Sequence, residues 1–142
     1  MLQFSRNSSS KPRQFNWWYA LMKSHWITYQ DKRIFVADFT NLGTSQNGLE
    51  EEGKAIKAAL ETEPIRSVLA ITNVDGTYIN ENMINTFRQI LADTNRIVKR
   101  RAVVGLGGFR RHFVFLFSKF AGSTDFVAFD TLDEACRWIV QD

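Results

Sequence analysis

The chain has 142 residues, of which 44% are hydrophobic and 23% charged, and this balance indicates one globular domain that folds without staples. Its single cysteine, Cys136, excludes an internal disulfide. No apolar run approaches the roughly 20 residues that span a bilayer, so we expect no transmembrane segment. Twelve phenylalanines predict an aromatic-rich core or an apolar contact surface.

The net charge of +3 is distributed unevenly along the chain. Residues 1–33 contain six basic residues and one acidic residue, so this segment carries +5 and the remainder carries −2. The high isoelectric point of 9.2 therefore belongs mostly to the N-terminal segment, and we do not expect the domain to bind nucleic acid. With no signal peptide in view and one cysteine, the sequence favours a reducing, cytoplasmic compartment.

The N-terminal region divides into two predicted parts. Residues 1–14 are polar, Ser-rich and basic, which is typical of a flexible tail. Residues 15–25 carry a dense aromatic group, and we expect a short helix there that begins at Asn16. Such a helix is stable only when it packs on something, so we expect it to mediate association. A twofold dimer is favoured over docking within one chain or contact with a membrane.

The first elements of the domain are a hairpin and a long helix. Residues 26–39 are rich in β-branched and aromatic residues, with a polar turn near Asp31 and Lys32. A helix is then predicted to begin at about Asn47, which has the spacing of a capping box with Glu50. The carboxylates of Glu50–Glu52 would lie in its first turn, and Pro64 follows its end. Its inner face would carry Leu49, Gly53, Ile56 and Leu60.

Strands and helices alternate through the rest of the chain. The predicted strands are 67–74, 101–106 and 126–129, and the predicted helices are 81–95, 109–122 and 131–140. Thr131 and Glu134 form a second capping box, and the last helix turns Leu132, Ala135 and Ile139 inward, with Trp138 at the edge of that stripe. This order predicts an α/β fold: a single, mostly parallel, mixed five-stranded sheet with helices on both faces.

The predicted helix 109–122 is unusually rich in phenylalanine. Its main apolar stripe would belong to the core, but Phe115 lies off that stripe, so the helix is apolar on more than one side. This pattern suits a second contact, with the aromatic N-terminal segment, a partner chain or an acyl ligand. The candidate apolar contact residues are Trp17, Trp18 and Phe115.

Three motifs mark the C-terminal part of the chain: KRRAVVGLGG in a strand and turn, SKFAG at a helix end, and FVAFDTLDEACRWIV in the last strand and helix. Together with the element order from Trp26 to Val140, they resemble the STAS/SpoIIAA-like family of small bacterial proteins. The resemblance implies a STAS/SpoIIAA-like domain over residues 26–142. That domain is related to anti-sigma-factor antagonists and, more remotely, to CRAL-TRIO lipid-binding domains.

In anti-sigma-factor antagonists, a serine in an Asp-Ser-Ser-Gly loop after the third strand is phosphorylated. The resemblance implies that Thr77–Met83 is the matching loop, with Asn80 at the aspartate and Asn82 at the phospho-acceptor. Asn82 has no hydroxyl, so ordinary serine phospho-switching is not expected. Glu81 keeps the loop acidic, although one carboxylate copies a phosphate poorly. The candidate interaction residues are Thr77, Tyr78, Asn80, Glu81 and Asn82.

Other patterns have plainer explanations. The glycines of 105–108 suit a phosphate-binding turn, but Arg110 stands where a Rossmann fingerprint needs glycine, which favours a tight turn. The basic cluster around 99–101 favours a solvated face, with Arg110 and Arg111 as the candidate contacts for an anion. His25 and His112 lack partners at ligand spacing, and Cys136 lies beside core positions. We expect no metal, no cofactor and no catalytic residue.

The leading hypothesis is a non-enzymatic regulatory or protein-binding module of the STAS/SpoIIAA-like type, without the phospho-acceptor serine. This hypothesis implies a protein partner, which the sequence does not identify. It also allows a homodimer. The first alternative is binding or sensing of an apolar, lipid-like ligand, which rests on fold analogy and the Phe-rich helix. The second alternative is an enzyme of unrecognised class.

Overall fold

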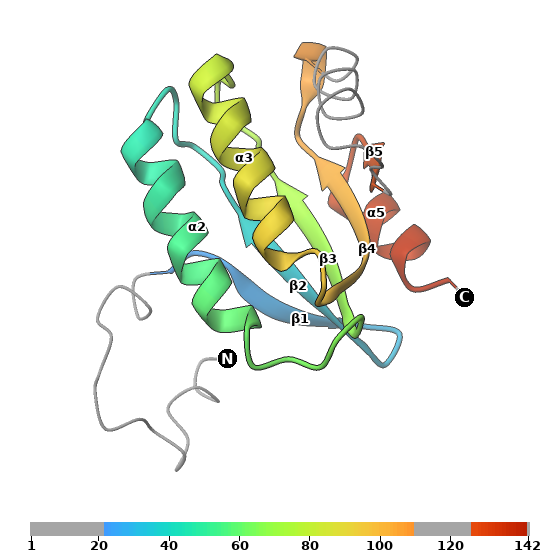
Figure 1. Ribbon diagram of the computed structural model, residues 1–142. Helices are drawn as coiled ribbons and strands as arrows, with labels where there is room; N and C mark the ends of the chain where they lie inside the picture. The colour runs from blue at the N-terminus through green and yellow to red at the C-terminus, as the bar shows by residue number, and fades with distance from the viewer. Residues whose placement is uncertain (1–21, 110–125, 142) are drawn as a thin grey trace.

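The computed structural model describes residues 22–109 and 126–141, and every structural statement below concerns these residues (Figure 1). Strands and helices alternate in it after an initial pair of strands. The strands are β1 (His25–Tyr29), β2 (Lys32–Asp38), β3 (Val68–Asn73), β4 (Val98–Val104) and β5 (Phe126–Phe129). The helices are α2 (Gln46–Leu60), α3 (Glu81–Thr94) and α5 (Leu132–Ile139), with a 3-10 turn, η2, at Gly107–Phe109.

The strands form one mixed sheet in the order β1-β2-β3-β4-β5. β1 is antiparallel to β2, and every other neighbouring pair is parallel. The predicted fold class, a mostly parallel, mixed five-stranded sheet, is therefore confirmed. Strand β4 starts three residues before the predicted position at Arg101.

The β1–β2 hairpin closes with a two-residue turn. Gln30 and Asp31 both have positive φ, at 49° and 65°, and Tyr29 pairs with Lys32 across the turn. Positive φ at both central residues is the signature of a type I′ turn, whose twist matches that of the flanking strands. The predicted turn lay one residue too late, because Lys32 is already the first residue of β2.

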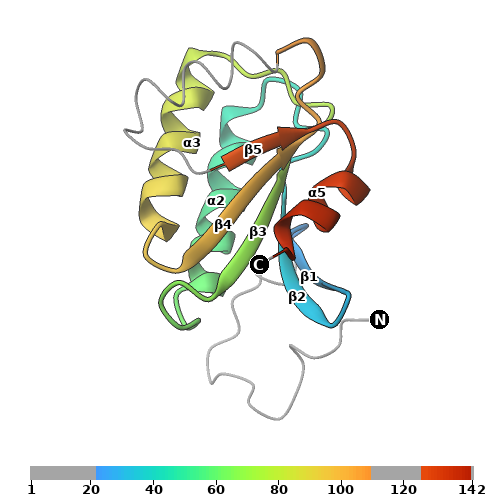
Figure 2. The same cartoon turned by 90° about the vertical axis from the view of Figure 1, so that its right-hand side faces the viewer.

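Helices cover both faces of the sheet, as predicted. α2 and α3 lie side by side on one face, and α5 lies on the other (Figures 1 and 2). The order from β2 to β4 always steps in one direction, so crossovers of one hand must place their helices on one face. α5 follows β5 and packs on the opposite face, where it contacts β3, β4 and β5.

The core beneath α2 and α3 is the larger of the two. It contains Phe35, Phe39, Leu49, Met83 and Phe87, all essentially inaccessible to solvent. The rings of Phe39 and Phe87 meet edge to face, with centroids 5.1 Å apart. Gly53 lets the two helices approach, because a Cβ there would lie 2.6 Å from Cδ1 of Ile90.

The second core lies beneath α5. Ile34 and Ile71 of the sheet pack there with Ala135 and Ile139 of the helix. Trp138 packs against this cluster as predicted, with its ring 5.6 Å from that of Phe129. Leu132 was predicted to face inward but is 39% exposed. The helix buries Ala135 and Ile139, as predicted, together with Cys136.

The start of α2 corrects the predicted capping box. Ser45 is the N-cap, and the backbone N–H of Gly48 donates to its hydroxyl oxygen at 2.9 Å. The helix therefore begins before Asn47, and no acidic residue lies in its first turn, contrary to the placement of Glu50–Glu52. The earlier start brings the amide of Gln46 to α3, where it donates to Oγ1 of Thr86 at 2.6 Å.

The predicted helix over 15–25 falls mostly outside the described residues. Of its last residues, Met22 to Ser24 are not helical and His25 already belongs to β1. Ser24 is 2% exposed, and its hydroxyl donates to Glu52 at 2.7 Å and accepts from the N–H of Asp38 at 2.9 Å. These bonds tie the chain to α2 and β2 just before the sheet begins.

Candidate functional site

Two loops that follow neighbouring parallel strands lie against each other at one end of the sheet. The loop after β2 spans 39–45, and the loop after β3 spans 74–80. Their backbones are joined by hydrogen bonds from Asn41 N to Asp75 O at 2.8 Å, from Gly43 N to Gly76 O at 3.1 Å, and from Tyr78 N to Gly43 O at 2.7 Å. We call these residues, 39–45 and 74–80, the loop pair.

Thr77 joins the two loops with its side chain as well. Its hydroxyl accepts from the N–H of Leu42 at 3.1 Å and donates to the carbonyl of Phe39. Both partners belong to the other loop, and the hydroxyl is partly buried between them. Thr77 is therefore a structural clamp of the loop pair.

Gly76 permits this close approach. Its φ is +78°, and a Cβ there would lie 2.3 Å from Oδ1 of Asn41 and 3.1 Å from the Asn41 backbone. A side chain at this position would meet both strain and a clash. The loop pair thus depends on a glycine that the sequence analysis treated only as part of a loop.

The remaining predicted loop residues lie at the start of α3. Asn80 is the N-cap, and its Oδ1 accepts from the N–H of Met83 at 3.0 Å. Glu81 and Asn82 are exposed in the first turn, where a carboxylate is favoured by the helix dipole. Tyr78 is 57% exposed beside them. The five predicted interaction residues are therefore together, but Thr77 and Asn80 have structural tasks.

The glycine-rich turn after β4 has a local explanation. Gly105 has φ +87°, and a Cβ there would lie 2.5 Å from the backbone nitrogen of Asp75. This close approach to the backbone of Asp75 explains why position 105 is glycine, and no bound ligand is needed to explain it. Gly107 and Gly108 begin the 3-10 turn η2.

The basic residues 99–101 do not form one patch. Arg100 points to the α5 side, with its guanidinium 4.4 Å from the ring centroid of Trp138. Arg101 points to the α3 side, where it donates to Leu91 O at 3.1 Å and Thr94 Oγ1 at 2.8 Å. Burial lowers the pKa of the Arg101 guanidinium to about 10. Arg101 thus donates hydrogen bonds to a carbonyl and a hydroxyl oxygen in the last turn of α3. Its guanidinium is used within the fold rather than facing a partner.

Several predicted contacts lie outside the described residues: Trp17 and Trp18 in the N-terminal segment, Phe115 in the Phe-rich segment, and Arg110 and Arg111 of the anion-contact prediction. Cys136 is buried, as predicted. Within 22–109 and 126–141, no three His, Cys, Asp or Glu side chains gather as a metal site. No helix of the same ranges is long and apolar enough to cross a membrane.

Two pairs of basic residues come together in the fold, although their meeting was not predicted from the sequence. Lys32 and Arg33 open β2, and Lys99 and Arg100 lie near the start of β4. Both strands are parallel neighbours of β3, so their first residues must flank the start of β3 at the same end of the sheet. The signal was present in the sequence as two basic pairs at strand starts.

Searches with protein-family models, of curated proteins and of solved structures each find no match to this chain.

Proposed function

We propose that the protein is a non-enzymatic regulatory or protein-binding module of the STAS/SpoIIAA-like type, acting in the cytoplasm through its loop pair. The observation that supports this most is Tyr78, which is 57% exposed on a loop whose backbone is bonded to its neighbour. Tyrosine is enriched at protein interfaces, where it supplies a large contact area and a polar tip.

The rigidity of the loop pair favours binding. Ordering a loop on association costs free energy, and a loop that is already ordered avoids most of that cost. The three backbone bonds and the Thr77 clamp hold Tyr78 in place before any partner arrives. A preorganised aromatic side chain of this kind is a suitable interface anchor.

The charge of the surface indicates the kind of partner. Residues 39–46 and 74–82 contain the acids Asp75 and Glu81 and no basic residue. Both acids are exposed. We therefore propose a partner protein that presents a basic surface around a pocket for a tyrosine ring. Because Asn82 lacks a hydroxyl, phosphorylation at that position has no part in the proposal.

Site-specific photo-crosslinking tests the proposal. A photoreactive phenylalanine analogue is placed at position 78 in the full chain and, as a matched control, at Ile65, which is 64% exposed at the other end of the sheet. We expect one protein to be captured from position 78 in the native host and not from position 65. Tyr78→Ala should then weaken binding of that purified protein at least about tenfold. Equal capture from both positions, or unchanged affinity, would overturn the proposal.

A further inference from the structure

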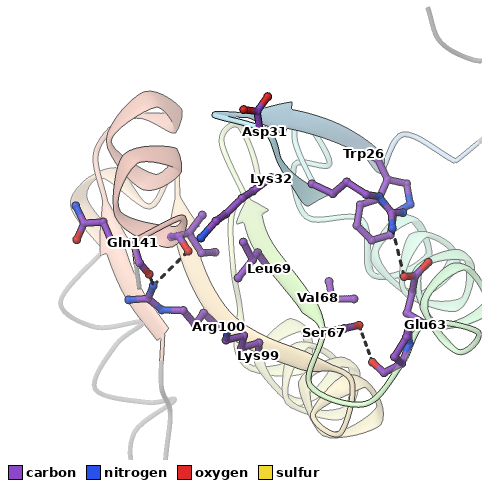
Figure 3. Close-up of a pocket in the computed structure, with 13 residues that line it drawn as sticks. Trp26, Asp31, Lys32, Glu63, Ser67, Val68, Leu69, Lys99, Arg100 and Gln141 are labelled. Atoms are coloured by element: carbon purple, nitrogen blue, oxygen red, sulfur yellow. Dashed lines mark hydrogen bonds and ion pairs between the residues drawn. The ribbon is translucent and has the colours of Figure 1, made fainter.

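A pocket of about 490 Å³ lies where β3 and β4 begin, at the end of the sheet opposite the loop pair. The hairpin turn, the start of β4 and the C-terminal end of α5 surround it (Figure 3). Its volume is within the range of small-molecule sites. The pocket is independent of the proposed protein contact, because no residue of the loop pair lines it.

The two sides of the pocket differ in charge. On one side, Arg33 is paired with Glu63 at 3.6 Å and lies over the ring of Trp26, 3.8 Å from its centroid. On the other side, Lys32, Lys99 and Arg100 gather around Leu69 of β3 (Figure 3). The lining includes four basic residues and two acidic ones, so it carries a net charge of +2.

Two of these cations are held by the end of α5. Nζ of Lys32 donates to Val140 O at 2.9 Å, and the Arg100 guanidinium donates to Ile139 O at 3.3 Å and to Gln141 O. These contacts fix the positions of two cations in the pocket lining. Cationic groups that are already held in place are how a preorganised anion site is built.

The third cation, Lys99, lies at a bulge in β4. Val68 pairs with Val98, but Leu69 pairs with Arg100, so Lys99 is an extra residue in β4. A bulge of this kind changes the direction of the side chains that follow it. Here Arg100 faces α5 on the same side as Leu69, while Lys99 is exposed and lines the pocket.

The lining also contains aliphatic side chains. Leu69 is half-buried against the core beneath α5 and Ile139 is buried in it, whereas Val68 is buried in the core beneath α2 and α3. Cationic groups beside the aliphatic side chain of Leu69 match a ligand with an anionic head and a short apolar body. The head would meet the ammonium groups, and the body would cover Leu69.

We propose that this pocket binds a small amphipathic organic anion, with its carboxylate or phosphate at Lys99 and Lys32 and its aliphatic body on Leu69. Calorimetric titration of the full chain with octanoate, octyl phosphate and uncharged octanol tests this. We expect saturable binding of at least one anion at millimolar concentration or below, and octanol at least about tenfold weaker. The stronger of the two anions identifies the head group.

Two variants assign the binding to the pocket. Lys99→Gln should raise the Kd of the preferred anion about tenfold, since it removes a charge and leaves the fold intact. Lys54→Gln, an exposed lysine on α2 that does not line the pocket, should leave the Kd unchanged. The chemical shift of the Leu69 amide should move in the parent titration. No saturable binding, or equal effects of both variants, would overturn the proposal and leave the Tyr78 contact untouched.

Discussion

Tyr78 and Thr77 are neighbours with opposite exposure. The Thr77 hydroxyl is shared between Leu42 and Phe39 in the loop pair, so a phosphate there would break both bonds. Tyr78 is exposed, but a phosphate on it would add negative charge to a segment, residues 74–82, that contains Asp75 and Glu81 and no basic residue. We therefore expect no stoichiometric phosphorylation of this loop in cells. Phosphopeptide mapping tests this, and high occupancy at Thr77 or Tyr78 would contradict it.

Cys136 is a single residue whose environment makes a chemical prediction. Burial raises the pKa of its thiol, and the Asp133 carboxylate raises it further. We expect a thiol reagent at mildly alkaline pH to label the native protein much more slowly than the unfolded protein. Fast native labelling would mean that α5 opens readily.

The raised pKa of Cys136 also has a consequence for stability. The folded state holds the thiol proton more tightly than the unfolded state. The contribution of this thiol to stability is therefore complete below the pKa of the unfolded thiol, and it is lost as the pH rises through the pKa of the folded one. In Cys136→Ala, we expect the free energy of unfolding to fall less at alkaline pH than it does in the parent protein.

At the scale of the secondary-structure elements, the start of α2 offers a test between two candidate N-caps, Ser45 and Asn47. Ser45 accepts from Gly48 N in the structure, whereas Asn47 is an exposed residue inside the helix. Ser45→Ala should lower the free energy of unfolding by about 1 kcal/mol, and Asn47→Ala should change it by less than about 0.5 kcal/mol. Urea denaturation measures both. A larger loss in the free energy of unfolding for Asn47→Ala than for Ser45→Ala would instead support the capping box predicted from Asn47 and Glu50.

Helix α5 makes a second comparison possible. Trp138 packs on Phe129 and beneath the guanidinium of Arg100, so Trp138→Ala should cost about 3 kcal/mol. Leu132 is 39% exposed, and Leu132→Ala should cost less than about 0.5 kcal/mol despite its place on the predicted stripe. Equal denaturation midpoints for the two variants would show that α5 contributes little to the fold.

At the scale of the whole molecule, β1 is one element that is open to association. It is an edge strand of the described sheet, and residues 25–29 contain no proline or lysine, the residues that commonly protect an edge. Antiparallel pairing of two copies about Ile27 would set Trp26 opposite Thr28 of the second copy, a favourable aromatic and β-branched pair. We therefore predict a twofold dimer through β1 and the segment that precedes it.

The dimer prediction is tested by light scattering. Because Ser24 is bonded to Glu52 and Asp38, the truncation should remove residues 1–21 and keep Met22 onward. We expect a dimer for the full chain and a folded monomer for the truncated one. Thr28→Lys, an exposed position of β1, should give the same monomer, and Thr44→Lys should not. A full chain that is monomeric at high micromolar concentration would refute the dimer.

For most of the described residues, the sequence by itself determined which segments are strands and which are helices; Met22 to Ser24, predicted as the end of a helix, are not helical. A continuous apolar run predicted β3, and the spacing of Thr131 and Glu134 predicted the cap of α5, in which both reciprocal bonds are present. These features follow from chemistry within a few residues of one another. Helical and strand periodicity, caps and turns are therefore readable from the sequence. The candidate interaction loop at Thr77–Met83, by contrast, was predicted from the family resemblance.

Only the tertiary structure decided which distant segments meet. Ser45 rather than Asn47 caps α2, and the amide of Gln46 in the first turn of this helix bonds to Thr86 of α3. Leu132 is 39% exposed although it lies on the apolar stripe of α5. The bonding of the loop pair and the gathering of Lys32, Lys99 and Arg100 both follow from the order of the parallel strands. Periodicity reports which face of an element is buried, but strand order decides what that face and the ends of the strands encounter.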